Sequence, residues 1–110
     1  MPCTGSRFNR PMPLTLAAFQ TLIRDRYYPT DSARGTAGTF LWFIEEVGEL
    51  ATALQTNAPG KTPTATERAN LDQEFADVLA WLTTLANING VDLERACRKY
   101  TEPGVEGVKD

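Results

Sequence analysis

Two short acidic clusters, each inside a strongly helical stretch, constrain the fold of this chain more than any other feature. They read Glu45-Glu46-Val47-Gly48-Glu49 and Glu74-Phe75-Ala76-Asp77. Residues three or four apart lie on one side of a helix, so each helix presents carboxylates one turn apart. Like charges at this spacing repel, and two such helices facing each other repel more. A cation is therefore expected between them, and Mg2+ suits an oxygen ligand set.

The size of the chain sets the second limit. At 110 residues, 42% of them hydrophobic, it has room for one soluble globular domain with a single core. A chain this short buries only ~60–65% of the surface it exposes when unfolded, so association with another copy is a common remedy. The formal net charge of −3 and the lack of a long basic run predict no nucleic-acid partner.

Residue types that are absent or sparse exclude several functions. Histidine is absent, which removes the usual general base, the usual zinc ligand and the Ser/His and Cys/His nucleophile arrangements. Cys3 and Cys97 show no ligand spacing, so we interpret them as free thiols in a reducing cytoplasm, with Cys97 half-buried on a helix. Neither a signal sequence nor an apolar run of membrane-spanning length is found. We therefore expect a cytoplasmic protein with no membrane partner.

Hydrophobic periodicity predicts an all-α domain over residues 14–100, between a flexible lead-in at 1–13 and a flexible tail at 101–110. Turn-forming residues at 57–63 separate the second and third helices, which are expected to form an antiparallel hairpin. The four predicted helices span about residues 15–27, 37–56, 66–89 and 93–100.

Local signals define the ends of these helices. Pro29 is predicted to end the first one, leaving residues 28–35 as a loop. Thr15 and Asp92 are expected to be N-caps, and Gly90 is expected to be a C-terminal cap.

The angular positions of the acidic residues separate the two clusters. On the second helix the expected core stripe is Phe40, Phe43, Ile44, Val47, Leu50, Ala51 and Leu54, and on the third it is Leu71, Phe75, Val78, Leu82 and Leu85. Glu45 and Glu49 point almost directly away from the first stripe, whereas Glu46 lies at its border. Glu74 lies only about 40° from the centre of the second stripe, with Asp77 farther round on the same side.

A glutamate inside an apolar arc needs a partner, because burying a lone carboxylate costs several kcal/mol or more. No Lys or Arg lies three or four residues from Glu74, and the second helix offers further carboxylates rather than cations. A metal site is the simplest resolution. The alternative is a structural helical adaptor, in which Glu74 is exposed or paired with a distant arginine such as Arg26.

Aromatic residues lie beside the acidic clusters. The run Phe40-Leu41-Trp42-Phe43-Ile44 is apolar on every side of a helical turn, so a second subunit is expected to cover part of it. Trp42 precedes Glu46 by one turn and Trp81 follows Asp77 by one turn, so both flank the acidic site. Each alone is best explained by core or interface packing. When the two tryptophans are considered together, a base-stacking pocket and ordinary packing explain them about equally well.

The motif Glu-Glu-x-x-Glu followed by Glu-x-x-Asp on two helices resembles the MazG-like nucleotide pyrophosphohydrolases of the all-α NTP pyrophosphatase superfamily. The flanking residues Thr39 to Leu50, Glu74 to Leu82 and Leu85 to Glu94 are similar too. The resemblance implies a four-helix MazG-like bundle completed by oligomerisation, as a homodimer or homotetramer. It also implies hydrolysis of a nucleoside triphosphate to the monophosphate and pyrophosphate, in nucleotide-pool house-cleaning.

The resemblance assigns roles to individual residues. The implied Mg2+ ligands, with Mn2+ as a substitute metal, are Glu46, Glu49, Glu74 and Asp77. Glu45 or Glu49 would be the catalytic base for the attacking water. Candidate substrate-binding residues are Trp42, Trp81, Arg34, Asn87 and Lys99, with Lys61 and Arg98 as further sources of positive charge. For any single cation, ordinary surface charge is the alternative, and for Asn87 it is capping of a helix end.

Two other functions stay open at this point. Phosphoribosyl-ATP pyrophosphohydrolases have a similar length and acidic motif, although the residues leading into Glu45 and the position of Trp81 are more MazG-like. A nucleotide- or metal-binding helical dimer without catalysis is the second. The segment after Tyr100 also lacks the cysteine-bearing or basic continuation of similar proteins, which puts any phosphate contact there in doubt.

Overall fold

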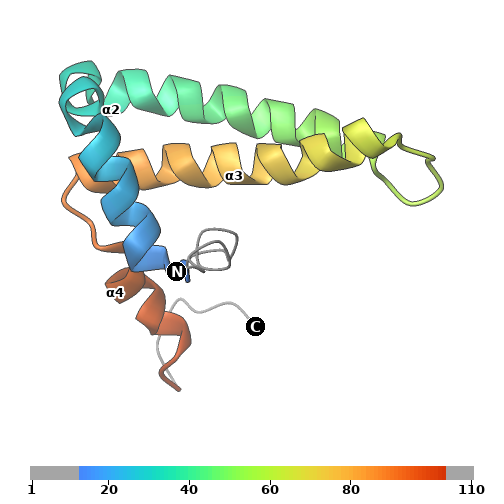
Figure 1. Ribbon diagram of the computed structural model, residues 1–110. Helices are drawn as coiled ribbons and strands as arrows, with labels where there is room; N and C mark the ends of the chain where they lie inside the picture. The colour runs from blue at the N-terminus through green and yellow to red at the C-terminus, as the bar shows by residue number, and fades with distance from the viewer. Residues whose placement is uncertain (1–12, 104–110) are drawn as a thin grey trace, which may run out of the picture.

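A computed structural model describes residues 13–103, and this part of the chain contains helices and no strands. The elements are α2 (Leu16–Thr56), α3 (Ala65–Ile88), the short α4 (Leu93–Cys97) and a 3-10 turn, η1 (Arg98–Tyr100). The second half of α2 runs antiparallel to α3, and the first half crosses the end of this hairpin (Figure 1). The predicted all-α class and hairpin are therefore confirmed. Cys3, nearly all of the predicted lead-in and most of the predicted tail lie outside the described residues.

The long helix α2 consists of two arms joined at Gly35. This residue has φ 79° and ψ 173° inside the helix, a backbone conformation that residues with a Cβ rarely adopt. Pro29 does not end the first helix, contrary to the prediction, because the helix continues past it. Of the loop predicted at residues 28–35, only the non-helical joint at Gly35 is present. Tertiary contacts compensate for the proline: Asp31, two residues later, is buried and accepts hydrogen bonds from Arg34 and Thr84.

Capping interactions fix both ends of α3. Thr64 and Glu67 form a reciprocal capping box, in which each side chain accepts a hydrogen bond from the backbone N–H of the other residue, at 3.1 and 2.9 Å. At the other end, Gly90 has φ 69°, and the N–H of Val91 donates to the carbonyl of Ala86 at 2.9 Å. This is the left-handed glycine termination expected for Gly90.

A glutamine side chain connects the first arm of α2 to the end of α3 through hydrogen bonds. Gln20 donates from Nε2 to Asn87 Oδ1 at 3.0 Å and to the carbonyl of Val91 at 2.7 Å, while its Oε1 accepts from the N–H of Leu93 at 2.9 Å. The Asn87 amide in turn donates to the backbone carbonyl of Gln20 at 3.3 Å. These contacts set the angle at which the first arm crosses the hairpin.

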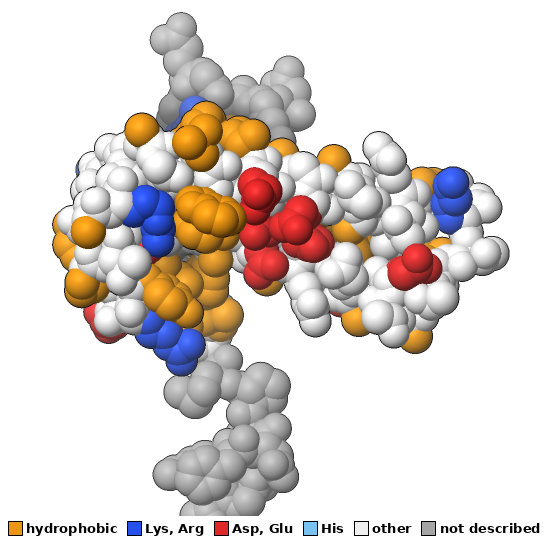
Figure 2. Space-filling view, turned by 90° about the horizontal axis from the view of Figure 1, so that it is seen from above, with side chains coloured by type: hydrophobic (Ala, Val, Ile, Leu, Met, Phe, Trp, Pro, Cys, Tyr) orange, Lys and Arg blue, Asp and Glu red, His pale blue; other side chains and the backbone are white. Residues whose placement is uncertain are grey.

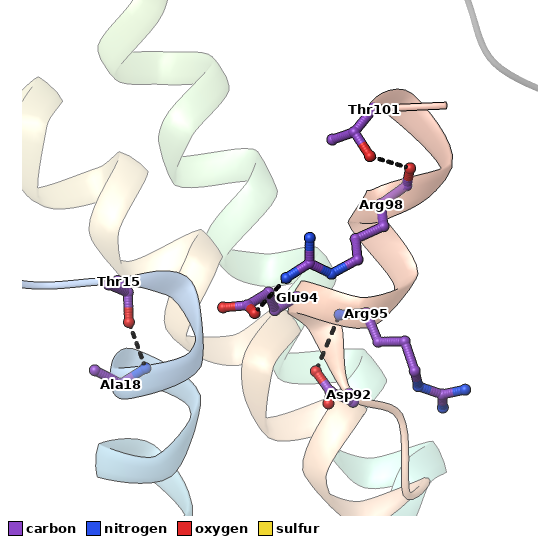
Figure 3. Close-up of polar contacts among 7 residues, drawn as sticks. All are labelled: Thr15, Ala18, Asp92, Glu94, Arg95, Arg98 and Thr101. Atoms are coloured by element: carbon purple, nitrogen blue, oxygen red, sulfur yellow. Dashed lines mark hydrogen bonds and ion pairs between the residues drawn. The ribbon is translucent and has the colours of Figure 1, made fainter. Parts of the chain in front are cut away.

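Local polar contacts shape both ends of the helical domain (Figure 3). Thr15 and Asp92 cap their helices by accepting from the N–H groups of Ala18 and Arg95, so both predicted N-caps are confirmed. Arg98 pairs with Glu94 at 3.0 Å. The predicted fourth helix is only partly α-helical, because η1 follows α4 from Arg98 onward. Cys97, expected to be half-buried, is exposed because the short α4 presents this position to solvent.

The core follows the predicted stripes only in part: Leu71 is buried as expected, and Phe43, Leu50, Val78 and Leu85 are half-buried. The buried residues are Ile23, Asp31, Thr39, Ala53, Leu71, Thr83, Thr84 and Ala86. Small side chains at Thr39 and Ala53 let α2 approach α3 closely, while larger members of the predicted stripes, including Phe40, Ile44 and Phe75, are about half-exposed in the single chain. None of the helices in residues 13–103 is long and apolar enough to cross a membrane.

Candidate metal centre and its flanking pockets

The structure brings all five predicted acidic residues into one cluster on the hairpin. Carboxylate oxygens of Glu45, Glu46 and Glu49 lie within 4.8 Å of one another, and so do those of Glu46, Glu74 and Asp77. Glu46 belongs to both groups and therefore links the two helices. Acidic side chains form one dense patch over the hairpin, bordered on one side by hydrophobic side chains and then by basic ones (Figure 2).

Helix register explains the position of each carboxylate. Glu46 lies seven residues from both Thr39 and Ala53, which are buried, so its side chain starts from the face of α2 that contacts α3. Glu46 and Glu74 are half-buried, in agreement with their angular positions in the sequence. The other three members of the cluster, Glu45, Glu49 and Asp77, are exposed.

Two oxygens of this cluster lack hydrogen-bond partners. Glu46 Oε2 and Glu74 Oε1 are both buried, and no atom of the described chain donates a hydrogen bond to either. An unsatisfied buried acceptor costs ~1–3 kcal/mol, and more when it is charged. A bound cation would remove this cost, and a hard divalent cation prefers such an all-oxygen ligand set. The donor set and the two unpartnered oxygens thus fit a divalent metal ion.

The pKa values of the two half-buried glutamates reflect the same crowding. The pKa of Glu46 is raised from 4.5 to about 7, first by burial and then by its close approach to the Glu49 carboxylate and the negative charges of Glu49, Asp77 and Glu74. The pKa of Glu74 is also raised, first by burial and then by the charges of Glu49 and Asp77, while the neighbouring Glu46 carboxyl, when it carries a proton, acts in the opposite direction. Without a cation, the cluster therefore retains a proton near neutral pH.

Three of the predicted substrate-binding residues lie together. The rings of Trp42 and Trp81 stack with their centroids 6.1 Å apart and their planes 12° apart. The Arg34 guanidinium carbon lies 5.1 Å from the centroid of the Trp81 ring, within cation–π range. Since Trp81 is one turn after Asp77, this group begins about 6 Å along α3 from the acidic cluster.

A pocket of about 340 Å³ opens next to this group, between the first arm of α2 and α3. Its lining residues are Ile23, Tyr27, Asp31, Arg34, Ala80, Trp81 and Thr84. Arg34 Nη1 donates to Asp31 Oδ1 at 3.2 Å and to Thr39 Oγ1 at 3.3 Å, and Thr84 Oγ1 donates to Asp31 Oδ2 at 3.1 Å. Sequence reasoning missed Asp31, because residues 28–35 were expected to form a loop. The i, i+3 spacing of Asp31 and Arg34 was the signal that could have revealed it.

A second, more polar pocket of about 450 Å³ adjoins the cluster on the side of the hairpin loop. It is lined by Glu49 and Glu74 of the cluster together with Thr52, Ala53, Thr56, Thr66, Glu67 and Asn70. Two of its hydroxyls are used within α2, since Thr52 and Thr56 donate to the carbonyls of Gly48 and Thr52. The acidic cluster thus lies between two pockets: the apolar pocket that contains Arg34 and the more polar pocket that is rich in hydroxyl groups.

The other predicted substrate-binding residues lie apart from this cluster. Asn87 is engaged by Gln20 and lines a different pocket, of about 280 Å³, beside Val91 and Asp92. The Lys99 ammonium lies 5.4 Å from the centroid of the Tyr100 ring. Among residues 13–103, neither side chain forms a hydrogen bond or ion pair with the five acidic residues.

Two comparisons find known proteins with similar sequences. A sequence model of the MazG nucleotide pyrophosphohydrolase domain matches residues 35–102, which include both acidic groups. A protein of Cyanophage S-2L named dATP/dGTP diphosphohydrolase is 34% identical over 87 residues, which cover 79% of this chain and 70% of the phage protein. The family match begins at Gly35, so Asp31 and Arg34 lie just outside it.

Proposed function

The chain belongs to the MazG nucleotide pyrophosphohydrolase family and is a nucleoside triphosphate pyrophosphohydrolase, and we propose that it uses Mg2+ to convert its substrate to the monophosphate and pyrophosphate. The observation that carries the metal requirement is the pair of unpartnered oxygens, Glu46 Oε2 and Glu74 Oε1. Mn2+ is the expected substitute, because it takes the same oxygen ligands. A role in house-cleaning of the cytoplasmic nucleotide pool is consistent with this reaction.

The acidic residues divide between holding the metal and handling the proton. Glu46, Glu49, Glu74 and Asp77 are the proposed ligands, and Mg2+ held there would neutralise negative charge on the triphosphate and the leaving pyrophosphate. Glu45 and Glu49 are exposed, so either carboxylate can accept a proton from the attacking water. In a chain without histidine, a carboxylate is the natural base for this step.

The proposed position of the nucleoside is beside the two tryptophans and Arg34. Trp42 and Trp81 present aromatic surface one turn from the metal ligands, which suits a base whose phosphates are at the cluster. The phage relative is named for dATP and dGTP, and purine deoxynucleoside triphosphates are accordingly the substrates we propose here. Asn87 and Lys99 stay candidates for contacts with the nucleotide that require a bound substrate or a second subunit.

A homodimer or homotetramer is part of the proposal. Bulky apolar side chains on the hairpin are exposed in the single chain, among them Phe40, Ile44, Val47, Leu54, Phe75, Leu79 and Leu82. On both helices they lie about 80–160° around the axis from Glu46 or Glu74, on the side away from the remaining carboxylates. Exposed apolar faces of this kind are typical of interfaces, and the partner that we propose for this one is a second copy of the chain. Leu79→Lys should lower the mass measured by light scattering, whereas Gln73→Lys should not.

Product analysis tests the reaction. The pure protein is incubated with a panel of NTPs and dNTPs, with Mg2+ or with EDTA, and the products are separated by anion exchange. Monophosphate plus pyrophosphate formed only with Mg2+, and lost in Glu46→Gln but not in Asp72→Asn, would support the proposal. Asp72 is a matched control because it is an exposed carboxylate on the same helix as Glu74. Turnover that persists in EDTA, or none with any nucleotide, would contradict it.

A further inference from the structure

Arg34 is held in place by a buried acidic partner. Asp31 is only 4% exposed, and each of its oxygens accepts a hydrogen bond, one from Arg34 and one from Thr84 on α3. Thr39, which is fully buried, accepts a second hydrogen bond from the same Arg34 nitrogen. The guanidinium is thus held by Asp31 on the first arm of α2 and by Thr39 on the second arm. Asp31 is itself held by Thr84 on α3.

Arg34 lines the pocket with unused hydrogen-bond donors, but Asp31 neutralises most of its charge. Within residues 13–103, hydrogen bonds from Arg34 start only at Nη1, so the N–H groups of Nε and Nη2 remain available. Its side chain is 25% exposed and lines the 340 Å³ pocket. Because Asp31 neutralises the guanidinium, a polyanionic phosphate gains less here than at an unpaired cation. A neutral group with hydrogen-bond acceptors suits the pocket better.

The pocket walls favour a flat heterocycle. Ile23, Tyr27, Ala80 and Trp81 contribute apolar or aromatic surface, and the pocket exceeds the ~300 Å³ at which ligand sites begin. Arginine provides donors only, and its fork matches the two acceptors N7 and O6 of guanine. Adenine would place its amino group, a donor, against the same fork, and the neighbouring Asp31 oxygens are nearly inaccessible.

We propose that Arg34 reads the N7 and O6 edge of a guanine base in this pocket, with Asp31 as the residue that positions it. The proposal rests on the proposed function for the location of the phosphates, and it adds which base is selected and by which residue. Neither Arg34 nor Asp31 falls within residues 35–102, where the family sequence model matches.

The experiment compares dGTP with analogues that remove one acceptor at a time. In the unmodified protein, kcat/KM should be on the order of 10-fold or more higher for dGTP than for 7-deaza-dGTP or dATP. By contrast, dITP keeps both acceptors and should resemble dGTP. In Arg34→Gln the ratio of dGTP to 7-deaza-dGTP should fall towards one, because glutamine lacks the guanidinium fork. Arg26→Gln, an exposed arginine on the same arm, should keep the original ratio.

Asp31→Asn tests the positioning role. It should reduce the discrimination between the same two nucleotides and raise KM for dGTP more than it lowers kcat, with thermal melting used to show that the variant is folded. If Arg34→Gln lowers kcat/KM for all nucleotides by one common factor, or leaves the 7-deaza ratio unchanged, the assignment of guanine recognition to Arg34 is wrong.

Failure of the proposed function is distinguished by a binding measurement. If no nucleotide is hydrolysed, calorimetric titration with dGMP and 7-deaza-dGMP still tests the pocket. Preferential binding of dGMP that is lost in Arg34→Gln would support base recognition without catalysis. Equal binding of the two monophosphates would overturn it.

Discussion

Two carboxylate sites of this small protein, Asp31 and the pair Glu46 and Glu74, differ in whether their buried oxygens have hydrogen-bond partners. Asp31 is 4% exposed and both of its oxygens accept hydrogen bonds. Glu46 and Glu74 are less buried, yet each has an oxygen without a partner. The degree of burial therefore does not decide what a buried carboxylate does. The number of nearby hydrogen-bond donors determines its role. A carboxylate whose oxygens are all hydrogen-bonded stabilises the fold, whereas one with an unpartnered oxygen needs a proton or a cation.

The largest effect is expected at the unsatisfied site. Glu46→Gln keeps the size of the side chain but removes a ligand shared by both acidic groups, so kcat should fall on the order of 100-fold or more. Its free energy of unfolding without metal should be unchanged or higher at pH 8, because one of several repelling charges is gone. Steady-state kinetics and urea unfolding measure both. Loss of stability together with activity would instead make Glu46 a structural residue like Asp31.

Asp31→Ala should show the converse pattern. The substitution leaves Arg34 and Thr84 without their acceptor, so we expect a loss of about 2–3 kcal/mol in the free energy of unfolding, reduced by the partial exposure of Arg34. Mg2+ affinity should change little, since Asp31 is not in the acidic cluster. Chemical unfolding and Mg2+ titration measure the two quantities. An unchanged unfolding midpoint would show that the hydrogen bonds of Asp31 contribute nothing net.

The different nature of the two sites explains why only one was predictable from sequence. The acidic cluster depends on one-turn spacing within two helices, which is local, so its five residues could be recognised before the fold was known. Asp31 acquires its role through Thr84, far away in sequence, and through a helix that continues past Pro29. The proline rule is local as well, and here tertiary contacts of Asp31 outweigh it.

The core shows the same limit. The predicted stripes grouped the bulky apolar residues of each helix, but they did not show which face of α2 meets α3. Small residues such as Thr39 and Ala53 determine that contact, and a search for bulky apolar periodicity passes over them. Bulky residues such as Phe40 and Ile44 instead lie on a face that remains open in the single chain.

Gly35 joins the arm that carries Asp31 to the arm that carries Glu46, so it links the two sites. Gly35→Ala should lower the free energy of unfolding by about 1–3 kcal/mol, because its φ of 79° with ψ of 173° suits only glycine. No atom lies within 4 Å of the Cβ that alanine would add, so the loss comes from the backbone alone. Gly48→Ala is the matched control: Gly48 is inside the helix with equal space, and alanine should stabilise it by about 0.5–1 kcal/mol. Thermal unfolding of both variants should give shifts of opposite sign, and two shifts of the same sign would show that Gly35 is not a strained joint.

The smallest expected effect concerns the pH dependence of stability without metal. The folded-state pKa of Glu46 is about 7 against an ordinary 4.5, so the folded state holds a proton that the unfolded state has released between these values. The stabilisation is complete below pH 4.5, decreases as the pH rises and is lost above about pH 7. Because Glu46 is partly exposed, screening reduces this contribution to about 1 kcal/mol, or roughly 4–8 °C in Tm between pH 5 and pH 8.

Glu46→Gln isolates this contribution from the other titrating groups. In EDTA, the Tm of the unmodified protein should decrease relative to the Tm of Glu46→Gln as the pH rises from 5 to 8. Saturating Mg2+ at pH 8 should reverse the trend, because binding to the ionised cluster stabilises the folded state in proportion to its occupancy. A difference that stays constant with pH in EDTA would mean that the Glu46 carboxylate is as well satisfied as that of Asp31, and the distinction between the two sites would then disappear.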